Sequence, residues 1–143
     1  MKNTYQEIKL ITNKEIELIN ITDSIHDAVA ASEIKFGMVY VLSFHTTSGI
    51  TVNEGLPDIE IDIIESLQKL IPETGHYHHA RFLHSDGQMA INAPSHLRSC
   101  FIGFEVFFPI ENGEMKSGSR QTVYFVELDG PQERTYCIKI IGD

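Results

Sequence analysis

The 143-residue sequence predicts a single domain, residues 1–143, that contains both strands and helices. An almost continuous apolar run at residues 38–44 is typical of a strand that is buried on both faces. Apolar side chains at helical spacing follow Pro57 and continue to Pro72, which predicts an amphipathic helix. Asn112-Gly113 lies between apolar segments and is a strong signal for a β-hairpin turn.

Two strands and a helix are expected at the start of the chain. Residues 5–10 and 15–21 have the pattern of strands on either side of a short polar turn, which predicts a hairpin. Residues 22–36 place apolar side chains on one helical face. Gly37 is expected to end this helix, because a residue without a Cβ adopts the left-handed conformation easily. The buried strand described above comes next, and a short alternating strand follows at residues 50–52.

The second half of the chain holds a long irregular stretch. Residues 72–95 show no sustained apolar period but contain apolar side chains that can anchor them, so we expect an ordered, functional loop. Residues 96–101 have the pattern of a short helix that ends at Gly103. Three further strands are predicted at residues 104–110, 121–128 and 134–141.

Composition and charge argue against two classes of partner. The formal charge is −9, and the eleven Lys and Arg residues are scattered, so the cationic surface that a nucleic acid needs is not expected. The N-terminus lacks the apolar stretch of a signal peptide and no segment reaches bilayer length, so no membrane partner is expected. Cys100 and Cys137 lie in apolar stretches without a CxxC spacing, which indicates a reducing compartment and a cytoplasmic protein.

A polar segment begins where the strand at residues 38–44 ends. Its residues are His45, Thr46, Thr47 and Ser48. A buried strand that ends in such side chains is expected to deliver ligands to a site. The hydroxyls and backbone N–H groups could bind an oxyanion, or they could be turn residues that bond their own backbone. Glu54 follows closely, either as a site residue or as a favourable charge at the start of the next helix.

Five of the seven histidines fall in one span that also carries an acid and an amide. The residues are His76, His78, His79, His84, Asp86, Asn92 and His96. Neutral imidazole and carboxylate are the usual ligands of zinc and related divalent ions, so a metal site is one interpretation. The spacing matches no local signature such as HExxH. The alternative is that several of these histidines are exposed loop residues, a role assigned here to His76 and His79.

Six blocks of sequence follow one another in the order of a known family. They lie at residues 45–54, 77–79, 86–92, 95–99, 109–113 and 124–131. Together they resemble the YjbQ family, whose members are also called secondary thiamine-phosphate synthases. The resemblance implies a compact α+β subunit with a mixed or antiparallel sheet packed with two or three helices, assembled as a homotrimer with polar pockets near subunit boundaries. It also implies that seven side chains converge in one pocket: His45, Asn53, Glu54, His78, Asp86, Asn92 and His96.

The activity that the resemblance implies is that of a thiamine-phosphate synthase-like transferase, which weakly joins hydroxymethylpyrimidine diphosphate to thiazole phosphate and releases pyrophosphate. A divalent ion, zinc or magnesium, would stabilise the leaving pyrophosphate. Its expected ligands are His45, His78, His96 and Asp86. The expected catalytic residues are Glu54, His45 and Asp86. The small phosphorylated or anionic ligand is expected to contact Thr46, Thr47, Ser48, Asn53, Asn92, Arg120 and Gln121.

The sequence departs from the family at residues 118–122. Most members carry Gly-Thr-Trp-Gln-Gly there, whereas this chain reads Gly-Ser-Arg-Gln-Thr and contains no tryptophan. A guanidinium in place of an indole changes a stacking wall into a cation, so the substrate is expected to differ. An enzyme is favoured, but three alternatives to the transferase stay open: a metal-dependent hydrolase of unknown substrate, a non-catalytic trimeric module that binds a metal or a small anion, and a purely structural assembly subunit.

Overall fold

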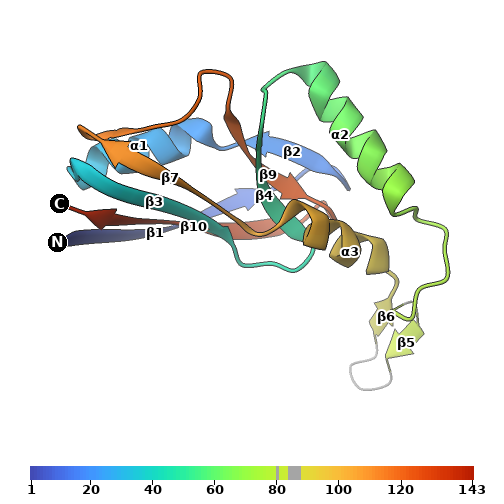
Figure 1. Cartoon of the computed structure of the whole chain (residues 1–143). Coiled ribbons are helices and arrows are strands. Elements are labelled where there is room, and N and C mark those ends of the chain that lie inside the picture. The colour runs from blue at the N-terminus through green and yellow to red at the C-terminus, as the bar shows by residue number, and fades with distance from the viewer. Residues whose placement is uncertain (80, 84–87) are drawn as a thin grey trace.

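The computed structural model describes residues 1–79, 81–83 and 88–143, and these residues form ten strands and three helices (Figure 1). The elements in chain order are β1 (Lys2–Ile11), β2 (Glu17–Asn20), α1 (Thr22–Ser32), β3 (Phe36–Ser43), β4 (Ser48–Asn53), α2 (Pro57–Leu70), β5 (Arg81–Leu83), β6 (Gln88–Ala90), α3 (Ala93–Ile102), β7 (Glu105–Glu111), β8 (Glu114–Met115), β9 (Thr122–Glu127) and β10 (Glu133–Gly142). The expected α+β fold with antiparallel sheet and three helices is confirmed.

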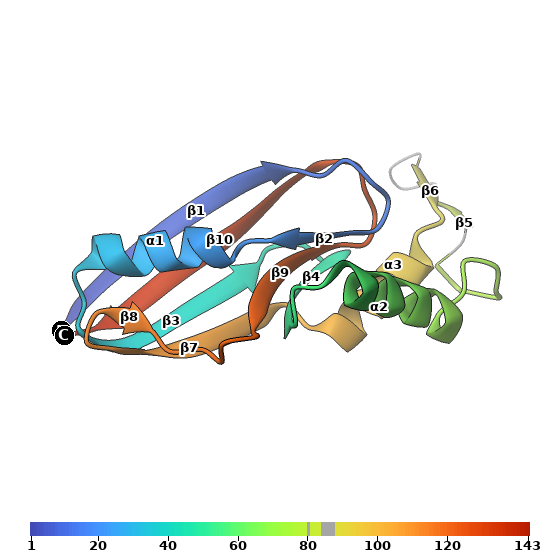
Figure 2. The ribbon, with the colours of Figure 1, turned by 90° about the horizontal axis from the view of Figure 1, so that it is seen from above.

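The strands form two main sheets and one small pair. The larger sheet has the order β1-β10-β3-β7-β8, the second has the order β2-β9-β4, and β5 pairs with β6. Every strand pair among the described residues is antiparallel. Figure 2 shows the long strands of the five-stranded sheet side by side, with α1 lying over one of their faces. The main core therefore lies between α1 and the two sheets.

The strand β9 is buried on both faces, which explains its nearly continuous apolar sequence. Val123 and Phe125 belong to the main core, together with buried side chains of α1. Tyr124 and Val126 pack on the opposite side with Leu67 of α2. Leu67 is the buried residue of α2, so this helix covers the second face of β9 with a narrow contact.

The first helix ends earlier than the sequence suggests. α1 ends at Ser32, and Glu33 takes the left-handed conformation with a φ of 56° while its N–H bonds the carbonyl of Ala30 at 3.3 Å. Gly37 lies in β3 instead. A Cβ there would collide with the backbone carbonyl of Ile141, so this glycine allows β3 to approach β10 closely.

The irregular stretch expected at residues 72–95 contains regular structure. β5 and β6 form a short antiparallel pair within it. α3 begins at Ala93 with Pro94 in its first turn, before the expected start at residue 96, because proline is well tolerated where a helix begins. His84 and Asp86, two members of the expected metal cluster, lie outside the described residues.

Candidate functional site

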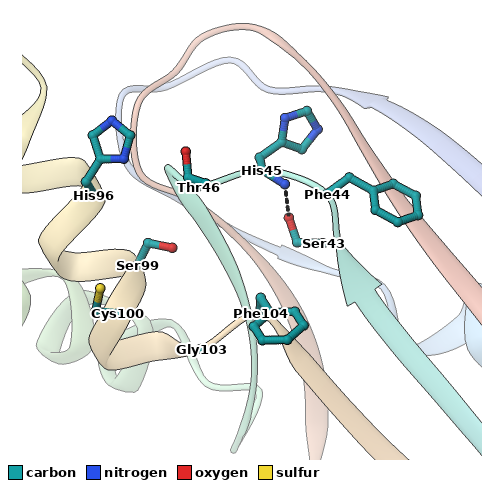
Figure 3. Close-up of a pocket in the computed structure, with 9 residues that line it drawn as sticks. All are labelled: Ser43, Phe44, His45, Thr46, His96, Ser99, Cys100, Gly103 and Phe104. Atoms are coloured by element: carbon teal, nitrogen blue, oxygen red, sulfur yellow. Dashed lines mark hydrogen bonds between the residues drawn. The ribbon is translucent and has the colours of Figure 1, made fainter.

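Two neighbouring hollows, which share His96, lie along α3. The first hollow has a volume of about 520 Å³ and lies between α3 and the connection from β3 to β4 (Figure 3). It is lined by Ser43, Phe44, His45, Thr46, His96, Ser99, Cys100, Gly103 and Phe104. The second hollow has a volume of about 440 Å³ and is lined by His76, Tyr77, His78, His79, Ala93, His96 and Leu97.

The two hollows differ from the rest of the chain in their charge. The chain carries 20 Asp and Glu residues and a formal charge of −9. None of the described residues that line either hollow is acidic, whereas five of them are histidines. Imidazole rings and hydroxyls therefore set the chemistry of both hollows.

Hydrogen bonds of serine side chains fix the residues around the first hollow. The hydroxyls of Ser43 and Ser48 are buried and lie 2.6 Å apart, which joins the end of β3 to the start of β4. The backbone N–H of His45 donates to Oγ of Ser43 at 3.2 Å (Figure 3). The hydroxyl of Ser99 in α3 donates to the carbonyl of Ser48 at 2.6 Å, so the helix is bonded to the start of β4.

The ring of His45 is held by the backbone of β10. The N–H of Thr135 donates to Nε2 of His45 at 2.8 Å, so the proton of the neutral ring is on Nδ1. Burial, and then the positive charge of Arg134, lowers the pKa of His45 below its ordinary value of 6.5. His45 is thus a neutral ring whose Nδ1–H is a hydrogen-bond donor.

A buried ion pair lies behind this ring. Arg134 is 3% exposed and donates to both carboxylate oxygens of Glu127, at 2.8 and 2.6 Å. The same guanidinium donates to the carbonyl and the hydroxyl of Thr47, at 3.0 and 2.8 Å. Burial alone would raise the pKa of Glu127, but the bonds from Arg134, Asp129 and Thr12 outweigh it and lower the pKa. The polar segment after β3 is therefore anchored by a charged pair inside the protein.

α3 turns one face to the first hollow and anchors another face to the segment after α2. His96, Ser99 and Cys100 lie on the side that lines the first hollow. Arg98 is fully buried, donates two bonds to the carbonyl of Ile71 and reaches Glu73 at 2.6 Å. These bonds of Arg98 hold residues 71–73, which precede the segment at residues 76–79 that lines the second hollow.

His79 lines the second hollow and is an exposed residue, as the sequence analysis expected. Its Nε2 lies 3.2 Å from Oδ1 of Asn92, and Nδ2 of Asn92 donates to Asp129 at 2.8 Å. The ring of His79 also stands edge-on to His96, with ring centroids 5.1 Å apart. The sequence signals for His79 were its place in a segment rich in histidine and in the family-like block at residues 77–79.

The structure separates the expected site residues into groups. Residues that line the hollows are His45, Thr46, His78 and His96, while Thr47, Ser48 and Asn92 support them from behind. His78 lines the second hollow and His45 lines the first, so the three expected imidazoles do not share one hollow. Asp86 lies outside the described residues.

The other expected residues lie at the far end of β4. Glu54 pairs with Arg120 at 3.3 Å, where the arginine is 81% exposed. Asn53 bonds the N–H of Glu54 at 2.8 Å and lines a separate hollow beside α2. Gln121 accepts a bond from the N–H of Gly118 at 2.6 Å. None of these four residues lines the first or the second hollow.

The described residues do not fit the expected metal ion. No group of three or more His, Cys, Asp or Glu side chains among them is placed to hold one. Nε2 of His45 already accepts the N–H of Thr135, and Nε2 of His79 is bonded to Asn92. The expected ligand Asp86 lies outside this part of the chain, so the divalent ion stays a prediction and no step below depends on it.

The fold and the two hollows define a small α+β protein with a histidine-lined candidate site in the part that the structure describes. The family model described as UPF0047 protein YjbQ-like matches residues 6–143. The chain therefore belongs to the UPF0047 family of YjbQ-like proteins, as the sequence resemblance predicted.

Relatives of known sequence and structure agree with this assignment. A UPF0047 protein of Methanocaldococcus jannaschii is 38% identical over 92% of this chain and 90% of its own. UPF0047 protein YugU of Bacillus subtilis is 32% identical over 94% of this chain and 97% of its own. The crystal structure of a YbjQ-like protein of unknown function from Sulfolobus solfataricus has a TM-score of 0.91 and 30% identity, and it covers 99% of both chains. A YjbQ/UPF0047 protein of Clostridium acetobutylicum has a TM-score of 0.84 and 37% identity over 95% of this chain and 99% of its own.

These findings correct the expected activity. The relatives are named only as UPF0047 or YjbQ-like proteins, and none of these names reports thiamine-phosphate synthesis. The described residues also lack the metal-binding group that the transferase, the hydrolase and the metal-binding module would use. The thiamine-phosphate synthase interpretation is therefore wrong. In the described part of the chain, no helix has both the length and the apolar character needed to cross a membrane.

Proposed function

We propose that the first and second hollows together bind a small anionic ligand, such as a phosphorylated metabolite, through hydrogen-bond donors of the protein itself. One observation carries this proposal: the hollows are lined by five histidines and by no described acidic residue, in a chain of formal charge −9. Because carboxylates elsewhere repel an anion, a site without them favours anion binding.

The donors of the first hollow support the proposal. The Nδ1–H of His45 is available because Nε2 is taken by Thr135. Thr46 adds a hydroxyl to the lining of the same hollow. Hydrogen bonds to ionised oxygens are stronger than bonds between neutral groups, so a phosphate group gains most from such donors.

The site is also pre-organised. Hydrogen bonds of Ser43, Ser48 and Ser99 fix the connection between β3 and β4. Arg134 bonds Thr47 of the same connection, which also carries His45. Binding therefore costs little ordering of the chain at this hollow. This rigidity favours a specific ligand over a loose surface contact.

Calorimetric titration of the full chain with inorganic phosphate tests the proposal. We expect His96→Ala to weaken binding, because His96 lines both hollows. His26→Ala is the matched control, since His26 is an exposed histidine of α1 and lines neither hollow. Phosphate that does not bind, or that binds His96→Ala as tightly as the unmodified chain, would contradict the proposal.

We also propose that the chain assembles with copies of itself into a homotrimer through the open face of the five-stranded sheet. Tyr5, Lys139, Tyr40 and Phe107 lie opposite one another on four adjacent strands of this face. Tyr5 is 55% exposed and Phe107 is 59% exposed. Other apolar side chains on the same face are Phe36, Met38, Leu42, Phe44, Pro109 and Ile141. Contiguous exposed apolar patches usually mark interaction surfaces.

A second copy on this face would border the ligand site, because Phe44 also lines the first hollow. Sedimentation equilibrium tests the assembly, with an expected mass of three times 16.2 kDa. Phe107→Glu is expected to lower that mass, whereas Ile61→Glu, at a 55% exposed position on α2, is expected to leave it unchanged. A monomeric wild-type chain would contradict this proposal.

A cytoplasmic location is proposed as well, since both cysteines are free thiols.

A further inference from the structure

The two hollows contain imidazoles whose protons are fixed in opposite ways. In the first hollow the N–H of Thr135, which can only donate, lies 2.8 Å from Nε2 of His45. That nitrogen must accept, so the ring carries its proton on Nδ1. His45 thus offers its remaining ring nitrogen as a donor.

The amide of Asn92 sets the opposite arrangement in the second hollow. Asp129 is an acceptor when ionised, so the amide nitrogen of Asn92 faces it at 2.8 Å. The amide oxygen of Asn92 is therefore left to face His79, at 3.2 Å from Nε2. Because an amide oxygen only accepts, Nε2 of His79 carries the proton and Nδ1 of the neutral ring keeps its lone pair.

The same buried ion pair, Arg134 and Glu127, bonds residues that neighbour or hold the two rings. On one side, Arg134 of the pair donates to Thr47, two residues after His45. On the other side, Glu127 accepts the N–H of Asp129 at 2.8 Å, and Asp129 in turn holds Asn92. Asn92 and Asp129 are positioning residues for His79 in this arrangement. His45, the donor ring, and His79, the acceptor ring, are therefore both linked through other residues to this ion pair.

We propose that the ligand of this site carries two different groups: an anionic acceptor, such as a phosphate or carboxylate, that receives the Nδ1–H of His45, and a donor, such as a hydroxyl or an amine N–H, that bonds Nδ1 of His79. His96 lines both hollows, so the ligand that spans them would also contact His96. This inference rests on the proposed anion site and adds the second group to its ligand.

Matched pairs of synthetic phosphates test the inference. Alkyl phosphates of about three to six carbons are titrated into the full chain, and each is compared with the same chain ending in a hydroxyl. One hydrogen bond corresponds to a roughly threefold to tenfold gain in affinity, so we expect the hydroxylated member to bind more tightly by that factor at one chain length or more. Several chain lengths are used so that the position of the hydroxyl relative to the phosphate is varied.

Three variants separate the two groups. His79→Ala is expected to remove the advantage of the hydroxyl and to leave the affinity for the alkyl phosphate unchanged. His45→Gln keeps an acceptor near Thr135 but loses the Nδ1–H, so both members of a pair are expected to weaken by the same factor. His26→Ala, on α1, is expected to change neither affinity.

The outcomes distinguish this inference from the proposed function. If alkyl phosphates bind but no hydroxylated partner binds more tightly, or if His79→Ala keeps the advantage, the inference is overturned and the anion site stands. If none of the phosphates binds, the anion site fails as well.

The proton positions can be read without any ligand. Long-range ¹H–¹⁵N spectra are expected to show the proton of His45 on Nδ1 and that of His79 on Nε2. Asn92→Ala is expected to let His79 exchange between both forms, and it removes no helix cap because the Asn92 side chain makes no cap bond. Asp129→Asn is a second variant for the same readout. A proton found on Nδ1 of His79 in the unmodified chain would overturn the inference.

Discussion

The backbone N–H of Thr135 and Nε2 of His45 are joined by a hydrogen bond of 2.8 Å. This bond links β10 to the connection after β3 and decides which ring nitrogen of His45 keeps a proton. It therefore turns a histidine that could bind a metal through either nitrogen into a fixed donor. The proposed anion site depends on this hydrogen bond.

His45 is expected to titrate below its ordinary pKa of 6.5, because burial and the charge of Arg134 disfavour the protonated ring. The unfolded chain then binds the proton first as the pH falls below about 6.5, so the free energy of unfolding decreases from there downward. Histidine NMR signals recorded against pH measure this pKa, and His45→Gln should lose the matching part of the stability change. A midpoint at or above 6.5 would show that the ring is not held as described.

Glu127→Ala is expected to destabilise the fold by about 3–5 kcal/mol, because it leaves the buried charge of Arg134 without its partner. Urea unfolding measures the change. Glu54→Ala is the matched control, since Glu54 pairs with an 81% exposed arginine and should change stability by at most about 1 kcal/mol. Equal effects of the two substitutions would refute the role given to the buried pair.

Acid is expected to weaken the fold through Glu127. Its pKa is lowered in the folded chain, so the unfolded chain takes up the proton first as the pH falls below the ordinary value of 4.5. The stability that this carboxylate contributes is present above that value and is lost as the pH falls toward the folded pKa. Unfolding measured from about pH 6 to pH 3 checks the slope. The result would argue against this explanation if Glu127→Gln showed the same acid sensitivity as the unmodified chain.

Arg98→Met is expected to loosen the segment that lines the second hollow, because the carbonyl of Ile71 loses both of its bonds from the guanidinium. Leaving a buried acceptor unpaired costs about 1–3 kcal/mol. Hydrogen exchange should therefore speed up at residues 71–79, and it should stay slow there in the control Arg120→Met, whose side chain is exposed. Unchanged exchange at residues 71–79 would mean that Arg98 is not their anchor.

Elements with a clear apolar period were predictable. The buried strand at residues 38–44 corresponds to β3 at Phe36–Ser43, and the strand at 121–128 corresponds to β9 at Thr122–Glu127. The amphipathic helix after Pro57 is α2. The end of α1 was not predictable, because Gly37 serves the close approach of two strands, and that contact joins residues far apart in sequence.

The site was partly predictable for a similar reason. The family resemblance implied that His45 and Glu54 lie in one pocket. They flank an extended strand, and its rise of 3.3 Å per residue places Ser48 and Asn53 about 17 Å apart. His79 is an exposed residue, as expected, but its bond to Asn92 was not predictable because nothing local in the sequence indicates it. Contacts of this kind form only when the chain is folded.

A crystal structure of the full chain with inorganic phosphate is the sharpest test of the anion site. We expect a phosphate in the first hollow, with one of its oxygens within hydrogen-bond distance of Nδ1 of His45. A first hollow that holds only water, with phosphate bound instead at the exposed Arg120, would contradict it.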